Sequence, residues 1–210
     1  MIDATHLTSA IHALNTGQVI ACPTGTLYGF TVDAGDRGAH RRLMRLKSRT
    51  TGHKGVILLV NSEGMARRLI ASPPLLARAL MRRFWPGALT LVLPARSTVP
   101  ESLTGPAHAG KRWIALRHDL SPVVQALLSM RPKPLVSTSI NRSGEPPMVE
   151  PERIQRRWGR DLGMIMPGSV HPDATPSTVL RVEEGCLTVL RAGAFPIATL
   201  RSRFPHVEIK

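Results

Sequence analysis

Three cations stand close together where a basic helical run gives way to an apolar strand. Lys47, Arg49 and Lys54 occur in the stretch RLMRLKSRTTGHKGVILLV, residues 41–59. In α/β proteins, ligands are held at the ends of the strands, so a cationic segment beside a strand has a candidate partner there. Lysine and arginine stabilise negative charge on phosphate without transferring a proton. The stretch therefore predicts a polyanion site.

Two further segments place hydroxyl groups at the ends of apolar strands. The first is CPTGTLYG, residues 22–29, which by itself is also typical of an ordinary turn. The second is VSTSINRSG, residues 136–144, and its density of polar groups favours a binding site over a plain turn. Hydroxyl, amide and backbone N–H groups suit a phosphate or a nucleotide. The polar side chains are Thr24, Thr26, Tyr28, Ser137, Thr138, Ser139, Asn141 and Ser143.

Arginine follows another apolar strand at Arg117, and Ser177 and Arg191 add polar groups near the C-terminus. A guanidinium group binds a carboxylate or a phosphate in a bidentate fashion. The candidate site has no Cys–His pair, serine triad or paired carboxylates, which excludes most hydrolase chemistry. What remains is transfer at phosphate, and the polyanion that fits best is the polyphosphate of a nucleotide.

Two other motifs lack residues that their chemistry requires. GPAHAGKR matches the glycines and lysine of a P-loop, but Arg112 stands where Ser or Thr binds magnesium. No strand precedes this segment and a strand, not a helix, follows it, so the helix N-terminus that cradles phosphate is missing. Cys22 and Cys186 form no CxxC pair and the histidines lack metal-ligand spacing, so no protein-bound metal is expected.

The elements that position these residues alternate between helices and apolar strands. This alternation predicts one α/β domain over residues 1–210, with a sheet of mixed strand directions. The long polar segment ARSTVPESLTGPAHAGKR, residues 95–112, is expected to be a mobile surface loop. Helices are expected in residues 6–17, 37–46, 62–70, 73–84, 121–130 and 151–159, and strands in 18–22, 28–34, 55–60, 88–94, 112–117, 133–139, 177–182 and 186–192.

Charge is the outstanding feature of the composition. The 210 residues carry a formal net charge of +14, which attracts nucleotides, nucleic acid or acidic partners. An arginine-rich solubilising surface is the alternative explanation for most of the arginines. Aromatic residues make up only 4%, too few for a surface that stacks rows of bases. No secretory signal or membrane-spanning run is visible, so a cytoplasmic protein without membrane partners is expected.

Five motifs taken in order resemble the YrdC/TsaC family, the threonylcarbamoyl-AMP synthases. They are PTGTLYG, KSR with the following Lys54, WPGALT, IALR and SINRSG, spread over about residues 8–148, with weaker similarity in PSTV and LRAG. The resemblance implies the YrdC-like fold, a twisted mixed sheet flanked by helices around a large basic cavity. It is closest to the short bacterial form.

The resemblance also implies an activity and its site. The implied enzyme is a nucleotidyltransferase that makes threonylcarbamoyl-AMP and pyrophosphate from L-threonine, bicarbonate and ATP with its Mg²⁺. A downstream complex then transfers the threonylcarbamoyl group to tRNA. Implied catalytic residues are Lys47 and Arg49, with Lys54 also neutralising phosphate. Implied nucleotide ligands are Ser137, Ser139, Asn141 and Arg191. Implied threonine ligands are Thr24, Tyr28, Arg117 and Ser177.

The chain departs from the family pattern at three positions, one of which is Leu59, where some longer members carry His. Gly25 replaces an acidic residue common after Pro-Thr, and Thr50 replaces the proline usual after K-x-R. The similar YciO branch lacks the full K-x-R and S-x-N set, and both are present here, which favours the synthase. Two alternatives remain: a non-catalytic RNA-binding protein acting on tRNA or rRNA, and a carbamoyl-phosphate-related transferase domain. Weak tRNA binding outside the cavity is a further expectation, because PERIQRRWGR repeats arginine.

Overall fold

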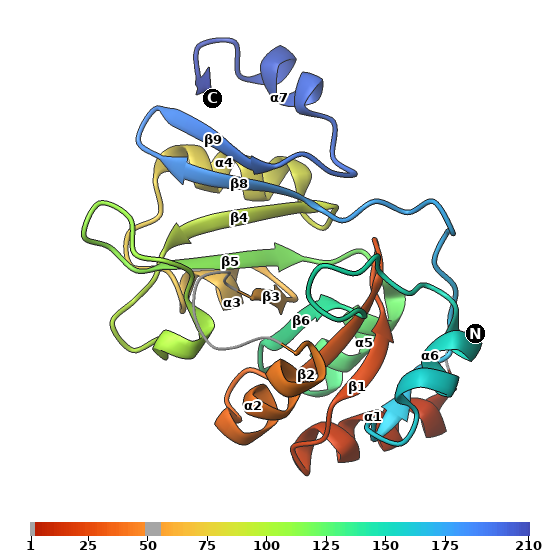
Figure 1. Cartoon of the computed structure of the whole chain (residues 1–210). Helices are drawn as coiled ribbons and strands as arrows, with labels where there is room; N and C mark the ends of the chain where they lie inside the picture. The colour runs from red at the N-terminus through yellow and green to blue at the C-terminus, as the bar shows by residue number, and fades with distance from the viewer. Residues whose placement is uncertain (1–2, 49–55) are drawn as a thin grey trace.

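One twisted sheet of ten strands organises the computed structural model, which describes residues 3–48 and 56–210 (Figure 1). The strand order is β10-β9-β8-β4-β5-β3-β6-β2-β1-β7. Neighbouring strands pair in both parallel and antiparallel directions, which confirms the predicted mixed α/β sheet. The strands are β1 (Ile20–Pro23), β2 (Tyr28–Asp33), β3 (Ile57–Val60), β4 (Leu89–Pro94), β5 (Trp113–His118), β6 (Leu135–Ser139), β7 (Met164–Ile165), β8 (Thr178–Glu183), β9 (Cys186–Arg191) and β10 (Glu208–Ile209).

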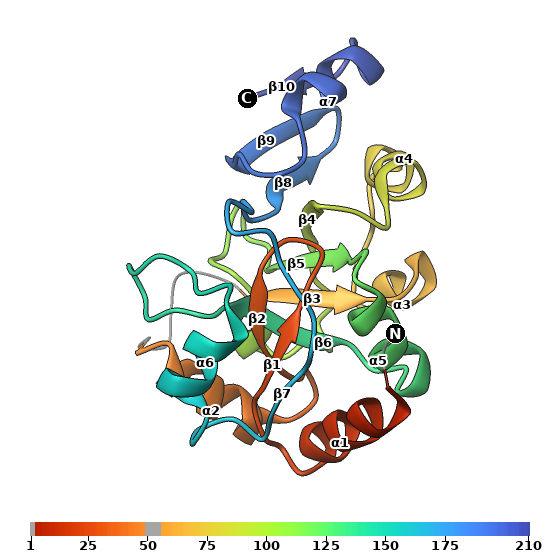
Figure 2. The ribbon, with the colours of Figure 1, turned by 90° about the vertical axis from the view of Figure 1, so that its right-hand side faces the viewer.

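Helices lie on both sides of the sheet, as Figure 2 shows from a second direction. They are α1 (Ala4–Asn15), α2 (Arg37–Leu46), α3 (Glu63–Arg67), α4 (Leu75–Phe84), α5 (Pro122–Met130), α6 (Pro151–Trp158) and α7 (Ile197–Arg203), with the short 3-10 helix η1 (Glu101–Leu103). No helix in these two described ranges is long and apolar enough to cross a membrane.

Two apolar clusters hold the layers together. Successive residues of β1 serve both clusters: Ile20 packs with α1 and α5, whereas Ala21 faces the larger cluster of the remaining helices. In the larger cluster, Phe30 of β2 meets Trp158 of α6 edge to face, with ring centroids 5.3 Å apart. Because β1 is buried on both faces, its residues form a continuous apolar run in the sequence.

Several helix ends follow from local signals. Helix α1 ends at Asn15, and Gly17 adopts a positive φ of 72°. The backbone N–H of Gln18 reaches the carbonyl of Ala13 at 2.8 Å, the bond typical of a glycine-terminated helix. Ser62 caps α3 as predicted, through a 3.1 Å bond from Met65 N–H, but the helix ends at Arg67, short of residue 70.

Ser121 precedes α5 as predicted, but its side chain does not cap the helix. Its hydroxyl donates to the carbonyl of Pro23 at 2.6 Å, which ties the start of α5 to the end of β1. Asp119 accepts the backbone N–H of Ser121 at 2.8 Å. The helix start is therefore held by a neighbouring strand and by an aspartate two residues upstream.

The segment 95–112 is more ordered than a plain surface loop. It contains η1, and Val99 and Leu103 are buried in the larger apolar cluster. His108 and Lys111 form an isolated antiparallel bridge, so no helix follows the lysine of the rejected P-loop match. Most of the segment lies at the surface as predicted, and its two buried apolar side chains anchor it to the sheet, whereas its mobility stays a prediction.

Candidate active site

A cavity of about 790 Å³ opens over one face of the central strands. Its floor follows one row of paired residues across the sheet: Ser137 lies opposite Ile57, and Ile57 lies opposite Ala115. The row continues from Ala115 to Val92 and from Val92 to Arg181. The floor therefore has an apolar middle and a polar group at either end.

Ser139 and Asn141 of the β6 loop line one polar end of the cavity, whereas Lys47, which is bonded to both, is only 4% exposed and is not a lining residue. The ammonium group of Lys47 donates to Asn141 Oδ1 at 2.6 Å and to the carbonyl of Ser139 at 2.9 Å. Asn141 Oδ1 also accepts the Ser139 hydroxyl at 2.7 Å, and the Asn141 amide donates to the carbonyl of Glu145 at 2.6 Å. The structure thus brings Lys47, Ser139 and Asn141 together from two separate segments.

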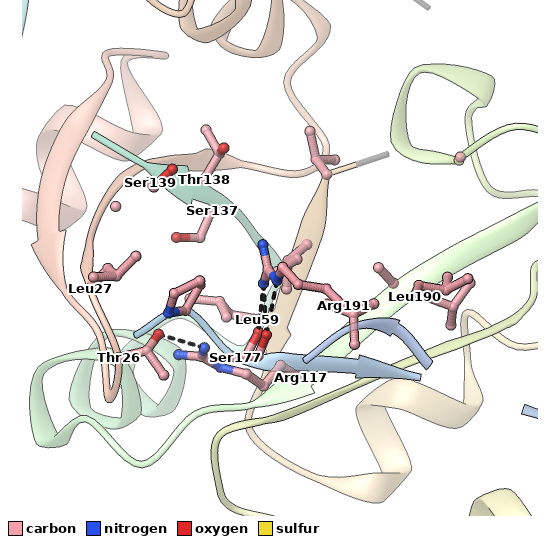
Figure 3. Close-up of a pocket in the computed structure, with 18 of the residues that line it drawn as sticks. Thr26, Leu27, Leu59, Arg117, Ser137, Thr138, Ser139, Ser177, Leu190 and Arg191 are labelled. Atoms are coloured by element: carbon pink, nitrogen blue, oxygen red, sulfur yellow. Dashed lines mark hydrogen bonds between the residues drawn. The ribbon is translucent and has the colours of Figure 1, made fainter. Parts of the chain in front are cut away.

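Ser137 presents its hydroxyl to the cavity beside Gly29 of β2. A Cβ atom added at Gly29 would collide with Ser137 Oγ. The glycine on β2 therefore leaves room for the hydroxyl of Ser137 on the neighbouring strand β6. Figure 3 shows Ser137, Thr138 and Ser139 together on one side of the cavity. The polar loop after the β6 strand is a wall of the cavity and not an isolated turn.

Arg117 lies at the opposite side of the cavity and is only 3% exposed. Its Nη1 donates to Thr26 Oγ1 at 2.8 Å, and its Nη2 forms an ion pair with Asp119 (Figure 3 draws the Thr26 bond). Burial and the nearby positive charge of Arg191 lower the pKa of Arg117 to about 9. The guanidinium therefore remains protonated at neutral pH, and the Asp119 carboxylate favours the same charged form.

Ser177 and Arg191 meet beside Arg117. Arg191 donates from Nε and Nη2 to the carbonyl of Ser177, at 3.0 and 2.9 Å. The Ser177 hydroxyl lies 2.8 Å from Thr90 Oγ1 and 3.2 Å from Arg191 Nη2. Burial lowers the pKa of Arg191. The weak similarity in PSTV and LRAG thus marks two segments that are joined at the cavity.

The side chains of the Thr24–Tyr28 segment divide into two groups. Thr24 and Thr26 line the cavity, with their hydroxyl oxygens 3.2 Å apart. Tyr28 is fully buried, and its hydroxyl lies 2.9 Å from the carbonyl of Gly168 and 3.1 Å from that of Met166. The Tyr28 hydroxyl thus holds the segment after β7, and its role in threonine binding stays a prediction.

Two predicted residues, Arg49 and Lys54, lie outside the described residues, and the basic character of the whole cavity stays a prediction with them.

Two residues that were not predicted for the site belong to its surroundings. Arg181 lines the cavity and pairs with Glu183, Nε to Oε2, at 3.0 Å. Asp119 stands behind Arg117. Within residues 3–48 and 56–210, no group of acidic, histidine or cysteine side chains could hold a metal.

The arrangement provides two anion subsites that differ in chemistry. At one end a lysine ammonium lies among hydroxyl and amide groups, which suits a phosphate chain. At the other end a buried guanidinium lies among threonine and serine hydroxyls, which suits a small carboxylate. The apolar floor between them is the place where two bound molecules would meet.

Comparisons with known proteins agree with this geometry. Residues 12–193 match the Sua5/YciO/YrdC family model, whose description reads "Telomere recombination". A threonylcarbamoyl-AMP synthase of Alkalilimnicola ehrlichii is 35% identical over 182 residues, which cover 85% of this chain and 91% of that protein.

Solved structures share the fold. The crystal structure of P. abyssi Sua5 complexed with L-threonine superposes with a TM-score of 0.90 at 27% identity, covering 100% of this chain and 60% of that one. E. coli YciO has a TM-score of 0.82 at 24% identity, covering 93% of this chain and 92% of its own, which shows the fold alone.

Proposed function

Because the chain belongs to the Sua5/YciO/YrdC family, we propose that it is a threonylcarbamoyl-AMP synthase that uses L-threonine, bicarbonate and ATP. The observation that carries the proposal is the pairing of two unlike anion subsites in one cavity. Ser139 and Asn141, both held by the buried Lys47, line one end, and Arg117 with Thr26 lines the other. Such a pair suits a reaction that joins an amino acid to a nucleotide.

The amino-acid end accepts threonine. Arg117 binds its carboxylate, and the hydroxyls of Thr24 and Ser177 are close enough to the same end to orient the rest of the molecule. Support comes from the relative that was crystallised with L-threonine. The amine of threonine forms a C–N bond to the carbon of bicarbonate and water leaves, which gives a carbamate that carries the oxygen nucleophile of the next step.

The nucleotide end accepts ATP together with its Mg²⁺. Ser137, Ser139 and Asn141 hold the phosphates, and Arg191 assists from β9. The carbamate oxygen attacks the α-phosphorus, a new P–O bond forms, and the bond to pyrophosphate breaks. Lys47, Arg49 and Lys54 stabilise the negative charge that accumulates on the leaving pyrophosphate. The enzyme is thus a nucleotidyltransferase.

The product is a reactive mixed anhydride, and its use requires an acceptor. We assign that step to a separate tRNA-modifying complex that transfers the threonylcarbamoyl group to adenosine. ATP and tRNA are both cytoplasmic, so the proposed reaction takes place there. The net charge of +14 supports weak contact with tRNA as well.

Pyrophosphate release tests the proposal. The purified protein is incubated with ATP, threonine and bicarbonate, and each component is omitted in turn. Release is expected only when all three are present. Release that continues without threonine contradicts the synthase, and a protein that releases none but retains RNA on a filter supports the non-catalytic alternative.

A further inference from the structure

A buried carboxylate stands directly behind the arginine that we assign to threonine. Asp119 is fully buried and forms an ion pair with Arg117 Nη2. It lies outside the cavity lining, whereas Arg117 and Thr26 are part of it. A buried charge is costly unless it is paired and hydrogen-bonded, so a fully buried aspartate at this point calls for an explanation.

Asp119 connects the three elements that surround the amino-acid end. Its Oδ1 accepts the backbone N–H of Gly25 and that of Ser121, both at 2.8 Å. Its backbone carbonyl accepts the side-chain amide of Gln125 in α5. The same carboxylate thus fixes the Thr24–Thr26 turn, the start of α5 and the guanidinium at the end of β5.

The contacts also fix which way the guanidinium is presented. Of its five N–H groups, one on Nη1 is directed to Thr26 and one on Nη2 to Asp119. The Nε atom of Arg117 has no hydrogen-bond partner among the described residues. Because Nε is buried, the remaining N–H groups of Nη1 and Nη2 are the ones left for a ligand.

Charge balance is the second consequence of the pair. Arg117 and Asp119 together are neutral, so the pair offers N–H donors without adding net charge to that of Arg191, which lies beside it. A polyphosphate is drawn mainly by net charge, whereas the single carboxylate of a zwitterionic amino acid needs directed donors. By contrast, the sequence near Lys47, whose bonds hold the other end of the cavity, contains two further cations, Arg49 and Lys54.

We propose that Asp119 is a positioning residue that orients Arg117 toward the threonine carboxylate and, by balancing its charge, weakens the binding of phosphate at this subsite. The proposal rests on the proposed function, because it assumes that Arg117 binds threonine. It assigns to Asp119 no contact with the substrate.

The variant Asp119→Asn separates the two roles of the carboxylate. Asparagine keeps an Oδ1 acceptor for Gly25 and Ser121 but removes the charge that pairs with Arg117. Threonine affinity, measured by calorimetry, should weaken by about tenfold or more, while ATP affinity changes by less than about twofold. Inorganic phosphate should displace threonine more readily from Asp119→Asn than from the wild type.

Asp33 provides a matched control. It forms a similar buried ion pair with Arg131, and neither residue lines the cavity. Asp33→Asn should lower the melting temperature and leave threonine affinity unchanged. If Asp119→Asn changes threonine affinity no more than Asp33→Asn does, or weakens both ligands equally, the proposal is overturned. Phosphate that displaces threonine no more readily from Asp119→Asn than from the wild type overturns the charge-balancing part.

A double variant covers the case in which Asp119→Asn does not fold. Arg117→Met with Asp119→Asn removes both charges of the pair, a change that is often tolerated where a single removal is not. If the double variant folds and the single one does not, Asp119 acts through Arg117 as proposed. If neither folds, Asp119 is a structural anchor only. Wild-type protein that binds no threonine refutes the proposed function as well, whereas normal wild-type binding with an unaffected Asp119→Asn refutes this inference alone.

Discussion

The ammonium nitrogen of Lys47 lies 2.6 Å from Asn141 Oδ1, although 94 residues separate the two in sequence. The bond joins the end of α2 to the loop after β6. Asn141 Oδ1 also accepts the hydroxyl of Ser139, so Lys47, Asn141 and Ser139 form one hydrogen-bonded network at the phosphate end of the cavity.

Lys47→Ala should remove most of the synthesis. One lost charge contact to a developing anion costs about 2.7–4 kcal/mol, or about 100- to 1000-fold in rate. The rate is measured as pyrophosphate release at saturating ATP, with exposed Lys133→Ala as the control. Because Lys47 also holds Asn141, circular dichroism should be compared for both variants. Near-normal turnover of Lys47→Ala rules out its assigned role. The same assay applied to Arg49→Ala should give a loss of similar size.

Arg117→Lys should affect threonine more than ATP. Lysine keeps the charge but loses the planar fork that binds a carboxylate through two N–H groups and reaches Thr26 and Asp119 at the same time. Calorimetric titration of each ligand is the measurement. Equal weakening of both would reassign Arg117 to the phosphates.

Arg191→Gln should show the opposite selectivity. Its guanidinium is held by the Ser177 carbonyl and is assigned to the nucleotide, so ATP binding should weaken by about 1.5–3 kcal/mol, the range of a hydrogen bond to a charged group. Threonine affinity should fall by less, through the loss of the bonds that Arg191 makes to Ser177. A larger loss for threonine than for ATP contradicts the assignment.

Binding of tRNA should be weak, independent of sequence and outside the cavity. Arg156 and Arg160 near α6 are exposed, whereas Arg157 donates to Glu145 Oε1 at 3.0 Å and stacks over Trp158, so it is the poorer phosphate partner. Arg156→Glu with Arg160→Glu should weaken filter retention of tRNA and leave pyrophosphate release unchanged.

The control for tRNA binding is Arg201→Glu with Arg203→Glu on α7, at the far end of the sheet in Figure 1. Retention by the wild type should fall steeply with salt, with a slope near −0.9 per duplex phosphate neutralised. No retention at low salt, or retention that ignores salt, means that the surplus arginines serve only as a solvated surface.

Elements with strong local patterns could be predicted from the sequence. The bounds of α2 agree with the predicted 37–46, because the apolar positions Ala39, Leu43 and Met44 recur at helical spacing behind the Asp36 cap. The strands β7 and β10 were not predicted. Each has two residues and is defined by its pairing with another strand, β1 for β7 and β9 for β10. No local pattern in the sequence predicts such a pairing.

The site was predictable where polar groups cluster along the chain. Ser137, Ser139 and Asn141 stand within five positions. This density of polar groups indicates a site regardless of the residue at which the strand ends. Asp119 was missed because an aspartate between a strand and a helix is usually a turn residue. Its bond to Gly25 spans 94 residues, so only the fold reveals it. The pairing of Arg157 with Glu145 is likewise visible only in the fold, because Glu145 lies on a separate loop.

The central claim is that one cavity joins threonine, bicarbonate and ATP. Mass spectrometry after incubation with isotopically labelled bicarbonate tests it most directly, with and without unlabelled threonine. The account predicts a threonylcarbamoyl-AMP species that carries one labelled carbon, appears together with pyrophosphate and requires threonine. An adenylate that lacks the labelled carbon, or pyrophosphate release without any such adenylate, would contradict it.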